Sequence, residues 1–418
     1  MRNRRQHILA IILIFILVIG AGEVVLVKNI ANKSSVTINK YDKYQLFVGE
    51  VYDKIKANYW ETITDKDLSN LFLLAAKKVT STDLSLNTQD KNGVLQMVKM
   101  LEKKDTISTT VDMVLANLMP FGRSRLYSLK EEKALTNTVN NVDPASNLSE
   151  TLGIGKSATD KEVATAYEKK LKEVKTPEQK AAVVNAYKVL KNEDSRKIYE
   201  ISGVEPTIEY KLLSPDIYYV HMTKFSPTSL DEFVRVMDKV KDKSETLDTL
   251  IFDLRGNIGG AIDGLPYFLG PFIGPDTYAY QFYQQGKKED FKTLTGWLPS
   301  MVRYKKVVVL IDEYSQSTAE LMASSLKKYN VGVVVGKTTK GWGTVEKVLQ
   351  IDNQIASDEK FSLFLVHHVT IRDDGQPIEG RGVEPMISIN DVNWKKELLR
   401  RFNSPEIVKA VETIFYGK

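Results

Sequence analysis

The sequence predicts an α/β protein whose core is preceded by an all-α region and by an N-terminal transmembrane helix. Strands and helices alternate from Thr207 onward, which is typical of a layered α/β core. Before Thr207 the apolar residues recur at helical spacing, and near the start a long run carries no charge. A chain of 418 residues has room for about two to four domains of ordinary size.

A charge-poor segment at the start of the chain predicts a membrane span. Ile8–Gly22 carry no charge and Val24–Val27 continue the apolar run, so a helix over 8–27 is long enough to cross about 30 Å of hydrocarbon. Arginines in the segment 1–7 predict that this segment is a cytoplasmic tail and that the bulk of the chain is extracytoplasmic, either periplasmic or extracellular. The small residues Gly20-Ala21-Gly22 leave a cleaved signal peptide open as the alternative.

The composition excludes several classes of protein. The chain has 58 Lys plus Arg against 53 Asp plus Glu, a net charge of +5 that is too even for a nucleic-acid binder. It contains no cysteine, which excludes disulfide scaffolds, thiol nucleophiles and zinc–thiolate sites, and which suits an oxidising compartment. Its four histidines are too few to favour a multi-histidine metal site. Neither a metal nor an organic cofactor is predicted.

Residues 28–147 predict a linker followed by a helical region. The linker is polar, whereas from Tyr41 onward apolar residues recur at helical spacing. The cap-like sequence Asp65-Lys66-Asp67 predicts the start of a second helix. Further short helices are expected at Val94–Leu101 and Val111–Leu118.

Residues 148–201 predict a compact helical hairpin. A cap at Ser157–Asp160 opens a helix that runs to about Val174, and Pro177 opens a second helix at its favoured first-turn position. The order LGI, ATDKEVATAYEKKL and NAYKVLKNEDSRKIYE resembles a J domain. The His-Pro-Asp motif of a working J domain is replaced by Lys175-Thr176-Pro177-Glu178, so no chaperone ATPase is expected as a partner. We interpret this segment as a structural or docking module.

The core is predicted over residues 202–395, and 396–418 are expected to form a C-terminal helix. Strands are expected at Ile217–His221, Leu250–Leu254, Val307–Ile311 and Val331–Val335. Helices are expected at Leu230–Val240 and Ala319–Tyr329.

Two junctions in this core suggest chemistry. The strand of Leu250–Gly260 runs into a glycine-rich turn, whose open backbone N–H groups can hold an oxyanion or a phosphate. The turn lacks the Lys-Ser/Thr of a phosphate-binding loop, which argues against a nucleotide site. The second junction, Ser315–Glu320, places serines between a strand and a helix, where a hydroxyl serves either as a nucleophile or as an ordinary helix cap.

Four ordered segments resemble the carboxyl-terminal processing (tail-specific) serine peptidases. DLRGNIGG is similar to the family's DLRGNPGG, SQSTAE to SASASE, GKTTKGWGTVE to GEKTFGKGTVQ, and DGQPIEGRGVEP to its closing glycine-rich motif. Tyr41–Tyr59 also resembles the helical region that precedes the family's core. The resemblance implies a ClpP/crotonase-like peptidase core that acts on unfolded or processing-site polypeptides. The family's PDZ domain has no counterpart here, because the J-like segment occupies that place.

The resemblance also assigns roles to individual residues. It implies that Ser317 is the nucleophile and that the backbone N–H groups of Gly260 and Thr318 form the oxyanion hole. The residue that supports the family's catalytic base falls on Glu346. The base itself, a lysine, falls on Trp342, which has no basic site.

The missing lysine leaves the catalytic base open. Lys340 lies two residues earlier, so in an extended chain it points to the same face, displaced by about 6.6–6.8 Å, and can replace the base. Alternatively, His221, His367 or His368 takes the proton.

Two functions follow from these alternatives. The first is a membrane-anchored extracytoplasmic serine endopeptidase that uses Ser317 and a displaced base. The second is a catalytically inactive pseudopeptidase that binds extended peptides or a partner protein, since an aromatic side chain such as Trp342 can line a peptide groove.

Overall fold

A computed structural model of the chain describes residues 41–143, 147–155, 157–240, 246–372 and 374–417. The described residues from Lys43 onward form one compact unit. The predicted tail, membrane span and linker lie outside the described residues. Within the described part of the chain, no helix is both long enough and apolar enough to cross a membrane.

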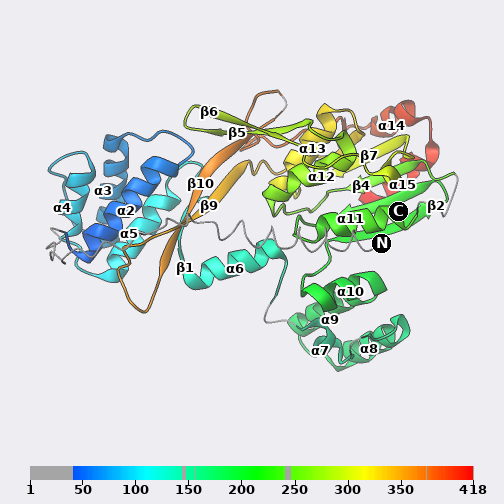
Figure 1. The fold of residues 1–418 in the computed structure, drawn as a ribbon, viewed down its shortest axis with the longest axis horizontal. Coiled ribbons are helices and arrows are strands. Elements are labelled where there is room, and N and C mark those ends of the chain that lie inside the picture. Colours follow the sequence, from blue (N-terminus) through cyan, green and yellow to red (C-terminus); the bar gives the residue numbers. More distant parts are fainter. Residues whose placement is uncertain (1–40, 144–146, 156, 241–245, 373, 418) are drawn as a thin grey trace, which may run out of the picture. The chain divides into compact units, whose positions relative to one another are not determined.

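The helical region consists of four helices that share one core. They are α2 (Lys43–Asn58), α3 (Asp65–Thr80), α4 (Lys91–Val98) and α5 (Lys104–Ala116), drawn in blue and cyan in Figure 1. Local signals start two of them, because the side chains of Thr64 and Asp90 cap α3 and α4. Phe47, Tyr52 and Phe72 are almost completely buried among these helices. The predicted helical region is therefore confirmed.

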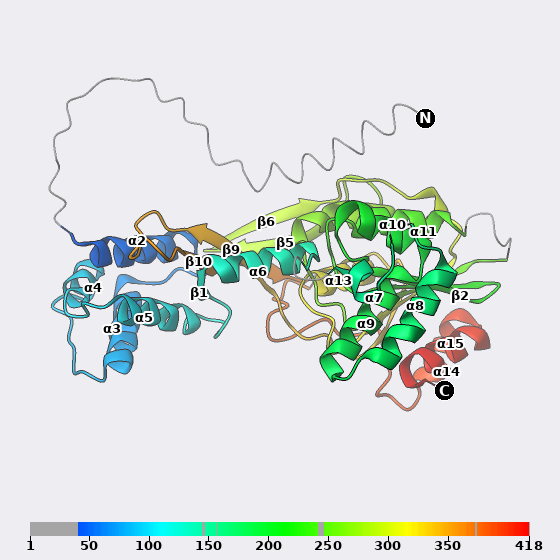
Figure 2. The same cartoon turned by 90° about the horizontal axis from the view of Figure 1, so that it is seen from below.

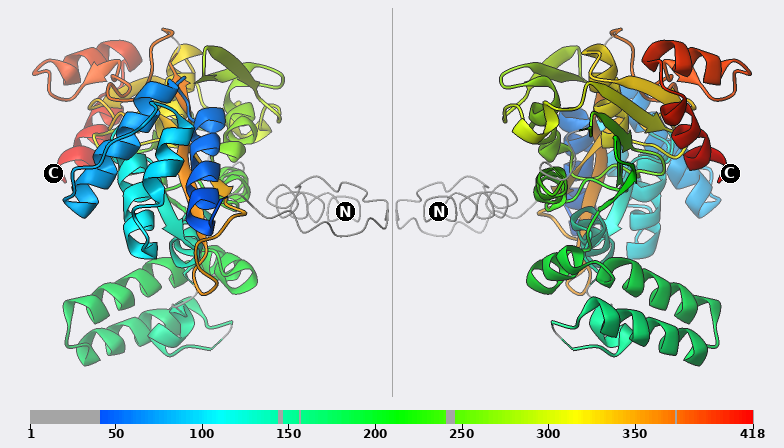
Figure 3. Two further views of the ribbon diagram at one scale, coloured as in Figure 1. Left: turned by 90° about the vertical axis from the view of Figure 1, so that its left-hand side faces the viewer. Right: turned by 90° about the vertical axis from the view of Figure 1, so that its right-hand side faces the viewer.

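The prediction that this region is all-α is wrong. Strand β1 (Arg125–Ser128) pairs antiparallel with β10 (Phe361–Ile371), and α6 (Leu129–Asn140) follows it. The core of α2–α5 is completed by Leu126 of β1 and by Leu363 and Leu365 of β10. The helices therefore pack against the pair of strands β1 and β10 (Figure 3). A strand of four residues carries almost no period-two signal, and its partner lies far along the chain.

The J-like segment forms a hairpin with a core of its own. Its helices, shown in Figure 2, are α7 (Leu148–Leu152), α8 (Asp160–Glu173), α9 (Pro177–Leu190) and α10 (Glu193–Ser202). Capping boxes begin α8 at Thr159 and α9 at Thr176. The rings of Tyr167 and Tyr187 stack with centroids 3.9 Å apart, which joins α8 to α9. The helical hairpin is confirmed, whereas its kinship to a J domain stays a prediction.

The core is built on a six-stranded sheet in the order β11-β8-β7-β4-β3-β2. Its strands are β2 (Ile208–Ser214), β3 (Ile217–Met222), β4 (Thr249–Asp253), β7 (Lys306–Ile311), β8 (Val333–Gly336) and β11 (Ile387–Ser388). All neighbours are parallel except β2 and β3. This arrangement confirms the predicted α/β class.

Helices cover both faces of this sheet. Residues of α11 (Ser229–Asp238), α12 (Leu265–Ile273) and α13 (Thr318–Lys328) share one apolar cluster with Phe252 and Val309. Residues of α14 (Trp394–Phe402) and α15 (Pro405–Tyr416) share a second apolar cluster with Ile251 and Val308. Ile251 directly precedes Phe252 on β4, and Val308 directly precedes Val309 on β7. Since successive side chains on a strand point to opposite faces, the two clusters lie on the two sides of the sheet.

The predicted single C-terminal helix is two helices. Asn403 ends α14 in the left-handed conformation, with a φ of 50°, and Ser404 caps α15, which starts with Pro405. Because proline lacks an N–H group and clashes with the preceding turn, it starts a helix more readily than it continues one.

A second sheet joins the core to the helical region. It runs β1-β10-β5-β6, with β9 (Thr344–Gln350) also paired to β10. Its other members are β5 (Tyr278–Gln284) and β6 (Lys287–Lys292). The β9–β10 hairpin thus carries the segment after Trp342 toward the helices α2–α5 (Figure 1).

Candidate active site

The two predicted motifs meet where β4 and β7 end. These strands are parallel neighbours, so the loops that follow them leave the sheet at the same edge, which is where α/β proteins usually bind ligands. The N–H of Gln316 donates to the carbonyl of Asn257 at 2.9 Å, and Thr318 Oγ1 donates to the carbonyl of Gly260 at 3.1 Å. The glycine-rich turn and the serine loop therefore form one site.

Ser317 lies at a strained turn from β7 into α13. Its backbone has φ 58° and ψ −123°, a conformation that L-residues other than glycine rarely adopt. An ordinary N-cap residue has an extended conformation, as Thr64 does at α3. The half-buried Ser317 thus resembles the exposed nucleophile of a strand–turn–helix elbow more than a simple cap.

Two glycines allow the turn to approach Ser317 closely. A Cβ on Gly259, whose φ is +79°, would lie 2.7 Å from the Cβ of Ser317. A Cβ on Gly260 would lie 2.0 Å from the carbonyl oxygen of Phe225. Any larger residue at either position would displace the turn.

The backbone leaves two N–H groups open beside Ser317. The N–H of Phe225 donates to the carbonyl of Gly259, and the carbonyl of Phe225 accepts from the N–H of Ala261. The N–H of Gly260, which lies between these two bonded groups, therefore points away from Phe225. Among the residues that the structure describes, neither this N–H nor that of Thr318 donates a hydrogen bond. Such unengaged donors can stabilise an oxyanion.

Trp342 is the residue on which the resemblance places the family's lysine. Its backbone N–H donates to Glu320 Oε2 at 2.8 Å, and its indole Nε1 donates to Glu346 Oε1 at 3.4 Å. Glu346 also accepts from Thr344 Oγ1 at 2.6 Å, and burial raises the pKa of its carboxyl group. Glu346 therefore lies beside the lysine position, with the indole as its partner.

Lys340 lies beside Gln316, the neighbour of Ser317, and forms no hydrogen bond with Ser317 itself. Its exposed Nζ donates to Gln316 Oε1 at 2.6 Å and lies 5.0 Å from the Trp342 ring centroid. Its backbone N–H donates to the carbonyl of Ser315. In this arrangement the lysine amine is engaged with Gln316 and would have to rotate to reach Ser317.

The three alternative histidines lie elsewhere. His221 Nε2 is 3.0 Å from the carbonyl oxygen of Arg255. His367 and His368 contact each other on β10, where burial lowers the pKa of both rings, that of His367 to about 4. Within the described ranges, none of the three forms a hydrogen bond with Ser317.

Sequence reasoning missed three residues that organise the site. Arg123, from the loop between α5 and β1, places its Cζ 3.4 Å from the centroid of the Trp342 ring. Arg123 also pairs with Glu379 at 3.0 Å, and Glu379 accepts the N–H of Gly343. The third is Glu320, whose position three residues after Ser317 fits a capping box, the one signal that could have found it. Nothing in the local sequence marks Arg123.

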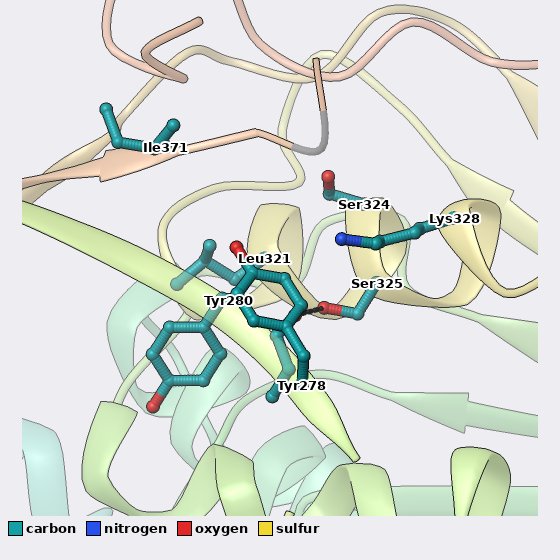
Figure 4. A pocket seen from close by; sticks show the side chains of 8 residues that line it. Tyr278, Tyr280, Leu321, Ser324, Ser325, Lys328 and Ile371 are labelled. Atoms are coloured by element: carbon teal, nitrogen blue, oxygen red, sulfur yellow. Dashed lines mark hydrogen bonds between the residues drawn. The ribbon is translucent and has the colours of Figure 1, made fainter. Parts of the chain in front are cut away.

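The pocket in Figure 4 is separate from this site. Side chains of β5, α13 and the end of β10 line it, and Lys328 Nζ lies 3.9 Å from the Tyr278 ring centroid. None of the predicted site residues lines this pocket. In the described segments, no group of three or more His, Cys, Asp or Glu could hold a metal ion.

The fold and the arrangement of this site are those expected of a serine-type peptidase domain, a hydrolase. Residues 216–389 match the model of Peptidase family S41. This match agrees with the carboxyl-terminal processing peptidase family that the four motifs predicted.

Proteases with carboxyl-terminal processing names are similar in sequence to parts of this chain. Carboxy-terminal processing protease CtpB of Bacillus subtilis is 27% identical over 221 residues, which are 50% of this chain and 43% of that protein. Tail-specific protease of Haemophilus influenzae is 32% identical over 111 residues, 26% of this chain and 15% of that protein. The chain thus matches less than half the length of these relatives.

A solved structure shares the fold. The photosystem II D1 C-terminal processing protease superimposes with a TM-score of 0.50 over 84% of this chain and 93% of that chain. The sequences are 13% identical, so this likeness concerns the fold alone.

Proposed function

We propose that the chain is a membrane-anchored extracytoplasmic serine endopeptidase of the carboxyl-terminal processing type. It cuts unfolded or processing-site polypeptides through Ser317. The observation that carries this proposal is the strained elbow at Ser317, which lies against the Gly259–Gly260 turn beside two unengaged backbone N–H groups.

The proposed chemistry is acyl transfer. Ser317 Oγ attacks the scissile carbonyl, and the N–H groups of Gly260 and Thr318 stabilise the negative oxygen that forms. The serine proton passes to a base and then to the leaving amine, after which water releases the acyl group and restores the hydroxyl. Lys340 is the candidate base, because rotation of its flexible side chain away from Gln316 would bring Nζ toward the adjacent serine.

The proposed location rests on the sequence of the first 27 residues. An uncharged run preceded by arginines supports a single span with the domain outside the cytoplasm. Alkaline extraction of membranes tests the anchor, and digestion of intact cells by an added protease tests the side on which the domain lies. Release of the full-length chain by alkali would contradict the anchor.

The J-like hairpin is proposed as a structural or docking module. Lys188 of α9 pairs with Glu209 of β2, and Asn192 donates to the hydroxyl of Tyr210 at 3.3 Å. These contacts support the proposal that the hairpin packs against β2, the strand at one edge of the six-stranded sheet.

The second candidate function is that of a pseudopeptidase. The observation that favours it is the Arg123–Trp342 contact, which fills the place of the family's lysine with an aromatic ring and a fixed cation. In this case the site would bind an extended peptide without cutting it.

Degradation of an unfolded model protein by the full chain separates these functions. We expect activity in the parent, its loss in Ser317→Ala, and its loss in Lys340→Ala if Lys340 is the base. Activity lost only in Ser317→Ala would overturn the role of Lys340 and favour a histidine. A folded parent that binds the peptide in fluorescence anisotropy but shows no Ser317-dependent cleavage would establish the pseudopeptidase.

A further inference from the structure

A fully buried carboxylate links the two halves of the candidate site. Glu320 lies in the first turn of α13, and its exposed fraction is 0%. Its Oε2 accepts the backbone N–H of Ser317 and that of Trp342, each at 2.8 Å. One oxygen atom thus binds both the nucleophile's residue and the residue at the family's lysine position.

The other oxygen extends this link. Oε1 accepts the hydroxyl of Thr339 at 2.5 Å and the N–H of Gly341 at 2.7 Å. The Thr339 hydroxyl accepts in turn from the N–H of Val383, in the fourth motif, at 2.7 Å. The carboxylate therefore holds the loop 339–342 against the serine elbow and, through Thr339, against the closing glycine-rich segment.

The four hydrogen-bond partners of Glu320 fit the ionised form of its carboxyl group. All four donate a hydrogen, so a protonated carboxyl group would present its own O–H to donors only. A buried charge is costly unless hydrogen bonds compensate it, and here burial raises the pKa of Glu320 above its ordinary value although these bonds offset part of the increase. An ordinary helix cap needs one or two such bonds and no contact with a distant loop.

We propose that Glu320 is a positioning residue that fixes the serine elbow and the loop 339–342 relative to each other. The carboxylate thereby sets the distance between Ser317 and any group that this loop brings to it, including Lys340. The inference rests on the proposed peptidase function only for its effect on catalysis, because the link between the two segments is structural.

Two variants and a control test the link itself. Glu320→Gln keeps the shape but turns an amide NH₂ toward two donors, whereas Glu320→Asp keeps the charge on a shorter stem. Glu313→Gln is the control, since Glu313 is an exposed carboxylate on the same loop that pairs with Lys337. In hydrogen–deuterium exchange of the full chain, we expect the amides of Ser317, Gly341 and Trp342 to exchange roughly tenfold faster in Glu320→Gln. Unchanged exchange at Gly341 and Trp342 in a folded variant would overturn the proposal.

A second measurement addresses the reaction. We expect Glu320→Gln to lower kcat and the rate of Ser317 labelling by a fluorophosphonate by about 10–100-fold, with little change in KM, because a small displacement of reacting groups is enough. Glu320→Asp should recover part of this loss. Equal labelling rates in parent and Glu320→Gln would contradict the positioning role. A parent that neither cleaves nor is labelled would end the proposed peptidase function, and the exchange experiment would still decide the role of Glu320.

Discussion

The guanidinium of Arg123 lies over the indole of Trp342, with 3.4 Å between the Arg123 Cζ and the ring centroid. The arginine comes from the loop that follows the helical region, and the tryptophan comes from the third motif of the peptidase core. A cation over an aromatic face is an attractive arrangement, and Glu379 neutralises this one. The loop that follows the helical region is therefore part of the candidate active site.

Returning a lysine to position 342 tests whether the base is all that the site lacks. In Trp342→Lys the new amine would lie beside Glu346, which accepts the indole N–H in the parent. In a parent without a working base we expect hydrolysis of the unfolded model protein to rise by about 10²–10⁴-fold, the usual contribution of a general base, whereas a parent that uses Lys340 should gain far less. Trp342→Phe, which has neither a basic group nor an N–H, is the control. Equal rates in the two variants would show that another part of the site limits the reaction.

Removing Arg123 tests the contact between the helical region and the core. The side chains of Arg123 and Glu379 are each only 16% exposed, so Arg123→Ala leaves a largely buried carboxylate with fewer donors. We expect the free energy of unfolding in urea to fall by about 1–3 kcal/mol. Arg125→Ala breaks a more exposed pair with Asp112 and should cost less than about 1 kcal/mol. Similar losses in both variants would contradict a special role of the Arg123 contact.

The Gly259→Ala variant tests the close approach of the turn to Ser317. The added methyl group would lie 2.7 Å from Ser317 Cβ and 3.1 Å from the backbone nitrogen of Thr318. We expect hydrolysis, or fluorophosphonate labelling, to fall by about 10²-fold or more, since an oxyanion donor is displaced. Gly256→Ala is the matched control, because its φ is also positive, at +66°, but nothing lies within 4 Å of its Cβ. A Gly259→Ala chain as reactive as the control would argue against this geometry.

The histidine pair on β10 predicts a loss of stability in mild acid. Burial, and then the neighbouring charge of His368, lower the pKa of His367 from 6.5 to about 4. The unfolded chain therefore binds a proton between these values that the folded chain does not, so stability is lost as pH falls from about 6.5 toward 4. We expect the free energy of unfolding to drop by about 1–2 kcal/mol over this range, allowing for the solvent that screens a half-buried ring.

A His367→Gln chain tests this assignment. Urea unfolding at several pH values should show a smaller dependence on acid in this variant than in the parent. His221→Gln controls for the loss of a histidine far along the chain. An identical pH dependence in the parent and in His367→Gln would exclude this ring as the cause.

Much of the site was predictable because its signals are local. The apolar run Val307–Ile311 predicts a buried strand wherever it lies, and Gly259 and Gly260 adopt positive φ at little cost whatever surrounds them. Thr159 and Thr176 cap their helices with residues only three positions away. The strand–turn–helix course around Ser317, and the absence of the lysine at 342, could likewise be read from short segments.

The contacts that decide how the site works are not local. The pairing of β1 with β10, the position of Arg123 over Trp342 and the attachment of Lys340 to Gln316 each join segments that come together only when the core packs. The same holds for the hydrogen bonds of Glu320 to the loop 339–342. A side chain's partners depend on which distant surfaces burial brings within hydrogen-bond reach. The sequence therefore predicted that the Ser317 turn and the glycine-rich turn belong to one candidate site, whereas only the packed chain shows that Arg123 and Glu346 surround Trp342.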